Sequence, residues 1–245
     1  MEIKDSIALV TGANRGIGEQ FIKALLDAGS IKIYASARDL NTLTPLVESA
    51  NDKIEALKLD ITKSEDVKKA AEKCTDINLL INNAGVNFNT PLIAIDSMDN
   101  ARIEMETNYF GTLNMCRHFA PILKANGGGA IINMLSILSR VSIPLMGSLC
   151  ASKAAGLIMT QGIRAELASQ GTLVVAVIPG AVDTRMSKDF EGPKARPMDV
   201  VKEVIDALVK GKEEVYPGDM ALEVAAGLAS DPKAVEKDFA KYLPQ

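Results

Sequence analysis

The stretch "TGANRGIG", Thr11 to Gly18, stands between an apolar run, "SIALV" at 6–10, and a segment of helical period, "EQFIKALLDAG" at 19–29. Glycines here let the chain turn sharply, so that a pyrophosphate can approach the backbone at the positive end of the helix. The spacing is Gly-x-x-x-Gly-x-Gly, not the commoner Gly-x-Gly-x-x-Gly. Alone it is compatible with a purely structural turn, but after the first strand of a parallel sheet it predicts a dinucleotide site.

Six more apolar runs follow, separated by longer segments of helical period. They are "IKIYAS" at 31–36, "IEALKLD" at 54–60, "INLLINN" at 77–83, "AIINML" at 130–135, "TLVVAVIP" at 172–179 and "EEVYP" at 213–217. Strands that alternate with helices predict a parallel sheet with crossover helices. We therefore expect a doubly wound, Rossmann-type α/β fold: seven parallel strands, helices on both faces, and residues 1–245 as a single domain.

Composition and charge narrow the choice of partners. The chain has 245 residues, 47% hydrophobic and 24% charged, which suits one large globular domain. Its net charge of −4 offers no basic field for nucleic acid or anionic lipid. No apolar run approaches the roughly 18 residues that span a bilayer, and "MEIKDSIALV" lacks the layout of a signal peptide. We expect a cytoplasmic protein that binds neither nucleic acid nor membranes.

The three cysteines, Cys74, Cys116 and Cys150, are too few and too scattered for a disulfide framework or a zinc site. We expect reduced, mostly buried thiols and no bound metal.

The end of the second predicted strand, "ASARD", bears on the choice of dinucleotide. An NAD site usually has a carboxylate roughly 20 residues past the glycines, whereas an arginine there suits a 2′-phosphate. Arg38 lies at that distance, and Arg15 inside the glycine turn adds a second guanidinium. The pattern favours NADP(H). The alternative is that Arg38 is merely solvated and Asp39 binds the ribose.

The segment "TRMSKDFEGPKARPMD", residues 184–199, is polar and contains Gly192, Pro193 and Pro197. It is either a solvated surface loop or a flexible segment that covers a substrate, and its length favours the second reading. Further on, "SDPKAVEKDF" predicts a helix with Ser230 or Asp231 as its N-cap and Pro232 in the first turn.

The chain resembles the short-chain dehydrogenase/reductase family from about Lys4 to its end. "TGANRGIG" matches the family's glycine motif, Asp60 in "KLDIT" its adenine-contacting position, "NNAG" (82–85) the motif after the fourth strand, and "PGAVDT" (179–184) the motif at the nicotinamide end. The resemblance implies that the cofactor is bound by Gly12, Asn14, Arg15, Gly16, Ile17, Gly18, Arg38, Asp60, Ile61, Asn83, Ala84, Gly85, Lys153, Pro179, Gly180, Val182 and Thr184.

The resemblance also implies a catalytic set. Asn108 in "METNYFGT" matches the asparagine that supports a proton-relay water, and Ser136 in "IINMLSILS" matches the serine that binds the substrate oxygen. Lys153 in "CASKAA" matches the lysine that binds the nicotinamide ribose and lowers the pKa of a catalytic tyrosine. That tyrosine should stand four residues earlier, where this chain has Leu149.

Leu149 has no proton to give to a carbonyl oxygen. General acid catalysis contributes typically about 10²–10⁴-fold, so ordinary ketone reduction should be strongly impaired. Ser148 and Cys150 are rotated about 100° away on the same helix. Tyr109 is expected to be a packing residue and His118 a surface or core histidine, which leaves Lys153 as a slower donor, directly or through water.

Three explanations for Leu149 stay open. The chain transfers hydride to or from a small carbonyl, alcohol, imine or alkene, slowly or where oxygen needs no proton. Alternatively it is a catalytically degenerate NADP(H)-binding protein, or an engineered replacement of tyrosine has inactivated it. The family resemblance further implies a homo-oligomer, a dimer or tetramer, that contacts its copies through the helices around Asn108 and Lys153. The apolar "VSIPLM" at 141–146 fits either a hydrophobic substrate pocket or ordinary packing.

Overall fold

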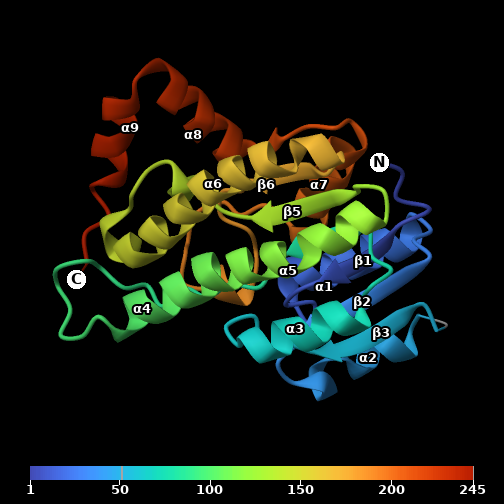
Figure 1. Cartoon of the computed structure of the whole chain (residues 1–245). Helices are drawn as coiled ribbons and strands as arrows, with labels where there is room; N and C mark the ends of the chain where they lie inside the picture. Colours follow the sequence, from blue (N-terminus) through green and yellow to red (C-terminus); the bar gives the residue numbers. More distant parts are fainter. Residues whose placement is uncertain (51, 245) are drawn as a thin grey trace.

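The computed structural model of the chain (Figure 1) describes residues 1–50 and 52–244. Within these residues one parallel sheet of seven strands has the order β3-β2-β1-β4-β5-β6-β7. The strands are β1 (Ile7–Val10), β2 (Lys32–Ala37), β3 (Ile54–Lys58), β4 (Leu79–Asn82), β5 (Ala130–Met134), β6 (Leu173–Val177) and β7 (Glu214–Val215). Six of the seven lie inside the predicted apolar runs and β2 ends one residue beyond its run, so the predicted Rossmann-type fold is confirmed.

Helices cover both faces of this sheet. They are α1 (Gly16–Asp27), α2 (Thr44–Glu48), α3 (Ser64–Lys73), α4 (Asp99–Met105), α5 (Thr112–Ala125), α6 (Gly147–Leu167), α7 (Pro197–Val209), α8 (Asp219–Ser230) and α9 (Pro232–Phe239). Short 3-10 turns lie at η1 (Leu40–Leu43), η3 (Ile137–Ser139), η4 (Pro144–Met146), η5 (Ala168–Gln170) and η6 (Arg185–Ser187). None of the helices in the described chain has the length and apolar character that crossing a membrane requires.

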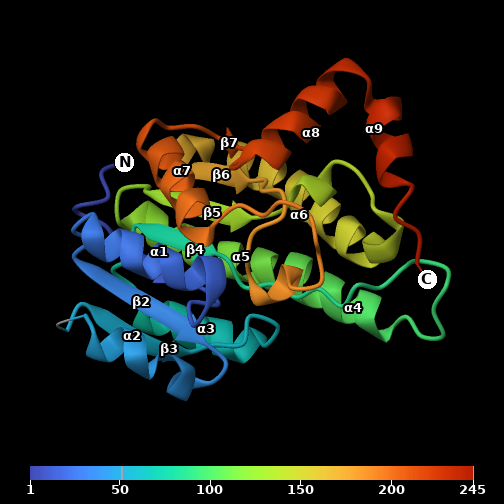
Figure 2. The same ribbon diagram turned by 180° about the vertical axis from the view of Figure 1, so that it is seen from behind.

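Alternate residues of each strand build two separate cores. In β1, Ala8 and Val10 pack with α1 and α7, which lie in front of the sheet in Figure 2. Leu9 points to the other face and packs with α3 and α5, which lie in front in Figure 1. Burial on both faces explains why the strands read as nearly unbroken apolar runs.

Two predicted boundaries near the end of the chain are settled by local capping. The segment expected to be a loop over 184–199 ends earlier, because Pro197 occupies the first turn of α7, where its missing N–H costs nothing. An isolated bridge between Val182 and Ala195 also ties the two ends of the loop together. At α9, Asp231 rather than Ser230 is the N-cap, since its side chain accepts a hydrogen bond from Ala234 N.

Candidate active site

The switch point between β1 and β4 is where this kind of sheet binds ligands, beyond the carboxyl ends of the strands. Hydrogen bonds join two of the sequence motifs there. The Thr11 hydroxyl accepts from the N–H groups of Asn83 and Ala84, at 2.9 and 3.0 Å, and the Asn83 amide donates to the carbonyls of Thr11 and Gly12. Asn83 therefore fixes the glycine turn against the end of β4 through its side-chain NH₂ group and its backbone N–H.

The glycine turn itself tolerates no side chains at its crowded points. Gly12 and Gly16 have positive φ angles of 63° and 56°. A Cβ on Gly18 would lie 2.2 Å from the carbonyl oxygen of Gly12, so the backbone could not keep this shape. No side chain in the described chain caps the start of α1, and its first N–H groups face the turn. The result is a cradle for an anion such as a pyrophosphate.

The two arginines expected at a 2′-phosphate are exposed, and neither forms an ion pair within residues 1–50 and 52–244. Asp39 is occupied elsewhere. Its carboxylate accepts from Asn41 N at 3.0 Å and caps η1, while its carbonyl accepts from the hydroxyl of Thr42. The arrangement leaves Arg15 and Arg38 free for a phosphate and gives Asp39 a structural role.

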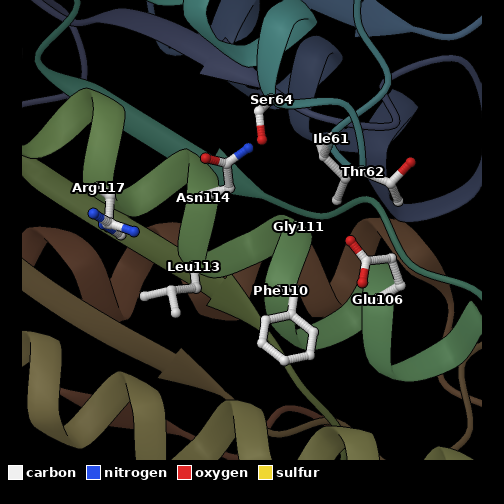
Figure 3. A pocket seen from close by; sticks show the side chains of 9 residues that line it. All are labelled: Ile61, Thr62, Ser64, Glu106, Phe110, Gly111, Leu113, Asn114 and Arg117. Atoms are coloured by element: carbon white, nitrogen blue, oxygen red, sulfur yellow. The ribbon is translucent and has the colours of Figure 1, made fainter. Parts of the chain in front are cut away.

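The adenine end predicted at Asp60 and Ile61 is well ordered by local contacts. The Asp60 carboxylate accepts from the N–H and hydroxyl of Thr62, and the Ile61 side chain packs so closely on Gly111 that a Cβ there would lie 2.9 Å away. Beyond Ile61 lies an open cavity of about 280 Å³, shown with its lining side chains in Figure 3. It is lined by Ile61, Thr62, Ser64, Glu106, Phe110, Gly111, Leu113, Asn114 and Arg117.

Asn108 lies in η2 (Glu106–Gly111), a π-helical turn inside the long α4–α5 helix. Such turns are frequent at functional sites because they re-aim side chains within a helix. The Asn108 amide donates to Val86 O and to the Ser152 hydroxyl, both at 3.0 Å, and its Oδ1 accepts from Val86 N at 2.9 Å. Both amide hydrogens are therefore used to join the end of β4 to α6.

Lys153 lies on α6 with its Nζ donating to the carbonyl oxygen of Met134, at the end of β5, at 2.8 Å. A Cβ placed on Gly85 would lie 3.6 Å from this Nζ and 3.0 Å from Asn108 Oδ1, so Gly85 keeps open the space between the two groups. Burial of the ammonium group lowers the pKa of Lys153 to about 8, and among the described residues no carboxylate counteracts this shift.

Ser136 follows β5, and its hydroxyl oxygen accepts from Leu138 N at 3.2 Å, which leaves its own proton free to donate. The next residue, Ile137, donates its N–H to Pro179 O at 2.8 Å. The Ser136 segment and the motif at 179–184 are therefore held side by side. Further along that motif, Thr184 returns to the glycine turn, since a Cβ on Gly16 would lie 3.3 Å from its methyl group.

The remaining predicted cofactor residues lie along the same edge of the sheet. Asn14 is half-buried in the glycine turn, Ile17 packs against the core behind it, and Val182 is buried beside Ala195. Gly180 is in close contact with Met220 of α8. The fold thus brings the predicted residues of the nucleotide and catalytic motifs to one edge.

Leu149 occupies the place one turn before Lys153 and is only 5% exposed. Its neighbours on α6 point elsewhere: the Ser148 hydroxyl contacts Glu104, and the Cys150 thiol contacts Ile143. Tyr109 packs edge-on against Phe110, and His118 bonds the carbonyl of Asn114 within its own helix. Of the alternatives considered from the sequence, only Lys153 keeps a transferable proton beside Gly85 and Asn108.

Two polar residues of the site escaped the sequence analysis. Glu104 is fully buried and binds Phe88 N at 2.7 Å and the Ser148 hydroxyl at 2.5 Å. Ser152 joins Asn108 to the carbonyl of Leu149. The spacing of Glu104 four residues before Asn108 was a usable signal, because positions i and i+4 share a helix face. Nothing in the sequence around Ser152 indicated that its hydroxyl would contact Asn108.

A glycine turn at the switch point of a doubly wound sheet is where Rossmann-type folds bind a dinucleotide, and here a serine, a lysine and an asparagine lie beside it. Comparison with known proteins gives the family. The short chain dehydrogenase family model matches residues 6–194. The chain therefore belongs to the short chain dehydrogenase family.

Individual relatives agree with this assignment. An uncharacterized oxidoreductase of Staphylococcus saprophyticus is 32% identical over 220 residues, covering 85% of this chain and 93% of the relative. An NADP-dependent 3-hydroxy acid dehydrogenase of Schizosaccharomyces pombe is 29% identical, covering 87% and 83%. A crystal structure of a short chain dehydrogenase from Burkholderia cenocepacia, in complex with NADP, is similar over 100% of both chains, with 47% identity and a TM-score of 0.92.

Proposed function

We propose that the whole chain acts as one NADP(H)-dependent oxidoreductase domain whose substrate does not depend on a phenol at position 149. One observation carries the proposal: Ser136, Lys153 and Asn108 are assembled at the cofactor edge, while the position one turn before Lys153 holds a buried leucine. Hydride transfer can proceed in such a site, but protonation of a substrate oxygen by residue 149 cannot.

NADP(H) is favoured over NAD(H) by the charges around the ribose. Arg15 and Arg38 offer two guanidinium groups for a 2′-phosphate, and Asp39 is used to cap η1. The similar Burkholderia cenocepacia protein was crystallised with NADP, which supports this choice. The bound cofactor would supply or accept the hydride.

The residues of this chain then have distinct tasks. The cradle made by Gly12, Gly16 and Gly18 holds the pyrophosphate, with Asn83 fixing the turn. Lys153 holds the nicotinamide ribose, and Ser136 donates a hydrogen bond that orients the substrate oxygen or nitrogen. Asn108 joins the end of β4 to α6 through two hydrogen bonds. Because Gly85 has no side chain, the space between Asn108 and Lys153 stays open.

The substrate class follows from what residue 149 lacks. An iminium carbon accepts hydride without a proton on nitrogen, and a polarised alkene takes its proton on carbon instead of on the oxygen that a phenol would protonate. Simple ketones need a proton on oxygen during the reaction, so their reduction should be about 10²–10⁴-fold slower than with a phenol in place. We expect small-molecule imines or activated alkenes to be the better substrates.

A catalytically degenerate NADP(H)-binding protein is the second candidate, favoured by the same buried leucine. Two measurements separate the candidates. Fluorescence titration compares NADPH and NADH binding, and steady-state assays compare ketone and imine reduction by this protein and by Leu149→Tyr. Tight NADPH binding with no hydride transfer to any substrate by the Leu149 protein indicates the degenerate reading. Failure to bind either dinucleotide contradicts both.

We further propose that the protein is a homo-oligomer. An open apolar groove is lined by Tyr109, Ala154, Ala155, Ile158 and Met159 on the outer side of α6. Ile158 is 68% exposed, and Phe110 beside Tyr109 is 50% exposed, so apolar side chains at and beside the groove face the surface together. A second copy of the chain is the occupant we propose. Light scattering should give a dimer or tetramer, and Ile158→Glu should shift it toward the monomer.

A further inference from the structure

We propose that Lys153 is itself the proton donor of this site, in the role that a phenol at position 149 would have. This inference rests on the proposed function, since it assumes that hydride transfer takes place here. It assigns to Lys153 a step beyond holding the ribose, and it gives the chain a slow carbonyl-reductase activity with its own pH dependence.

The position of the ammonium group supports the assignment. Lys153 Nζ donates one hydrogen to Met134 O at 2.8 Å, and its other hydrogens remain free. The group borders the space above Gly85, where a side chain atom would lie 3.6 Å from Nζ. Leu149 stands one helical turn away with an apolar side chain, so nothing on that residue competes for the reacting oxygen.

The other polar groups of the cluster have no proton to spare. Both amide hydrogens of Asn108 are taken by Val86 O and the Ser152 hydroxyl. The Ser152 hydroxyl donates to Leu149 O at 2.8 Å. Ser136 can donate a hydrogen bond, but a serine hydroxyl is too weak an acid to give up its proton near neutral pH. Lys153 is the remaining source in the described cluster.

Five titratable groups on α6 and its neighbouring elements lie against other parts of the molecule. Glu104 of α4 is bound to Phe88 and Ser148, and Glu106 of η2 lines the cavity of Figure 3. Tyr109 lines the apolar groove on the outer side of α6, and Arg140, after η3, binds the Tyr216 hydroxyl. On α6 itself, the Cys150 thiol contacts Ile143.

Burial is consequently the cause that sets the acidity of Lys153, and it lowers the pKa to about 8. The ammonium form predominates below that pH and is lost above it. An acid with a pKa near the working pH is well suited to proton transfer, because a large fraction of it is protonated and it still releases the proton readily.

Hydride and proton are delivered to the two ends of the substrate carbonyl group. Hydride from a reduced nicotinamide dinucleotide adds to the carbonyl carbon, and the electron pair of the C=O π bond passes to oxygen. The oxygen takes a proton from Lys153 Nζ as that N–H bond breaks. The alcohol leaves, and the neutral amine of Lys153 regains a proton from solvent.

Single-turnover reduction of 4-nitrobenzaldehyde by bound NADPH tests the step, beside reduction of a preformed cyclic iminium salt. We expect aldehyde reduction to be constant below pH 8, to fall about tenfold per pH unit above it, and to slow in D₂O, whereas iminium reduction should show neither effect. Lys153→Arg keeps the positive charge but cannot release a proton near neutral pH. Because Lys153 also holds the nicotinamide ribose, the variant should slow both reactions, and the measurement is the ratio of aldehyde to iminium reduction, which should fall by about 100-fold.

A second readout needs no cofactor or turnover. Competitive labelling with acetic anhydride, followed by peptide mass spectrometry, gives the titration midpoint of Lys153, with the exposed Lys68 as internal reference. We expect a midpoint near 8 for Lys153, against the ordinary lysine value near 10.4. A midpoint above 10 overturns the inference, whatever the kinetics show.

The outcomes separate this inference from the proposed function. If no hydride is transferred to the iminium salt, the proposed function is contradicted. The labelling midpoint then still tests whether Lys153 has the lowered pKa that the inference requires. Iminium reduction without any aldehyde reduction contradicts the inference and leaves the proposed function intact. Aldehyde reduction that is unaffected by Lys153→Arg and by pH also contradicts the inference.

Discussion

Two parts of the site lie along the same edge of the sheet. We call them the nucleotide edge, made of the glycine turn, Asn83, Arg15 and Arg38, and the catalytic edge, made of Ser136, Lys153, Asn108 and residue 149. At the nucleotide edge, Asn83 satisfies two carbonyls of the glycine turn, and within the described residues neither Arg15 nor Arg38 forms an ion pair. At the catalytic edge, Ser136, Lys153 and Asn108 are positioned equally well, yet residue 149 is apolar. Under the proposed function, the two parts differ at this one residue, whose side chain carries no hydroxyl.

The largest expected effect comes from closing the nucleotide edge with Gly18→Val. The new Cβ would lie 2.2 Å from Gly12 O, a backbone atom that cannot move away cheaply, so we expect loss of measurable NADPH binding by fluorescence. Gly162→Ala is the matched control, because space around its Cβ is open. It should bind NADPH normally and raise the free energy of unfolding by about 0.5–1 kcal/mol. Equal behaviour of the two variants contradicts the cradle.

Leu149→Tyr should remove the difference between the two edges. Restoring a phenol one turn before Lys153 is expected to speed ketone reduction by about 10²–10⁴-fold at pH 7, while the dissociation constant for NADPH changes little. Leu149→Phe adds a ring without the hydroxyl and should gain nothing. If phenylalanine gives the same gain as tyrosine, packing rather than a missing proton explains the slow reaction.

Arg38→Ala should weaken the nucleotide edge selectively. Hydrogen bonds to charged groups contribute about 1.5–3 kcal/mol, which corresponds to roughly 10- to 150-fold weaker NADPH binding. Binding of NADH, which lacks the 2′-phosphate, should be unchanged and serves as the control in the same titration. A parallel loss for both dinucleotides means that Arg38 is structural.

Substitution of Glu104 should have the smallest effect, and it tests how much this residue contributes to the stability of the fold beside the catalytic edge. Glu104→Ala leaves the buried N–H of Phe88 without its acceptor, so thermal or urea unfolding should show a loss of about 1–3 kcal/mol. Glu104→Gln can still accept from Phe88 and donate to Ser148, and it should recover most of that loss. Equal losses for alanine and glutamine would mean that the negative charge itself is required.

Most of the fold could be predicted from the sequence, because strands buried on both faces must be apolar throughout and their spacing leaves room only for crossover helices. All seven strand positions were found in this way. The end of the loop at 184–199 was misjudged, since Pro197 marks a turn in a loop and a helix start equally well. The π-helical turn at Asn108 could not be foreseen, because its sequence is compatible with a plain helix.

The sequence by itself determined the family's motifs, the order of the strands along the chain and the absence of a hydroxyl at position 149. Only the tertiary structure decided that the amide of Asn108 is used between Val86 and Ser152, and that the Lys153 ammonium is withdrawn from water with no carboxylate beside it in the described chain. The reason is physical. Residue types follow from local sequence, whereas hydrogen-bond partners and burial depend on segments as far apart as Gly85, Met134 and Lys153, which meet only when the sheet is assembled.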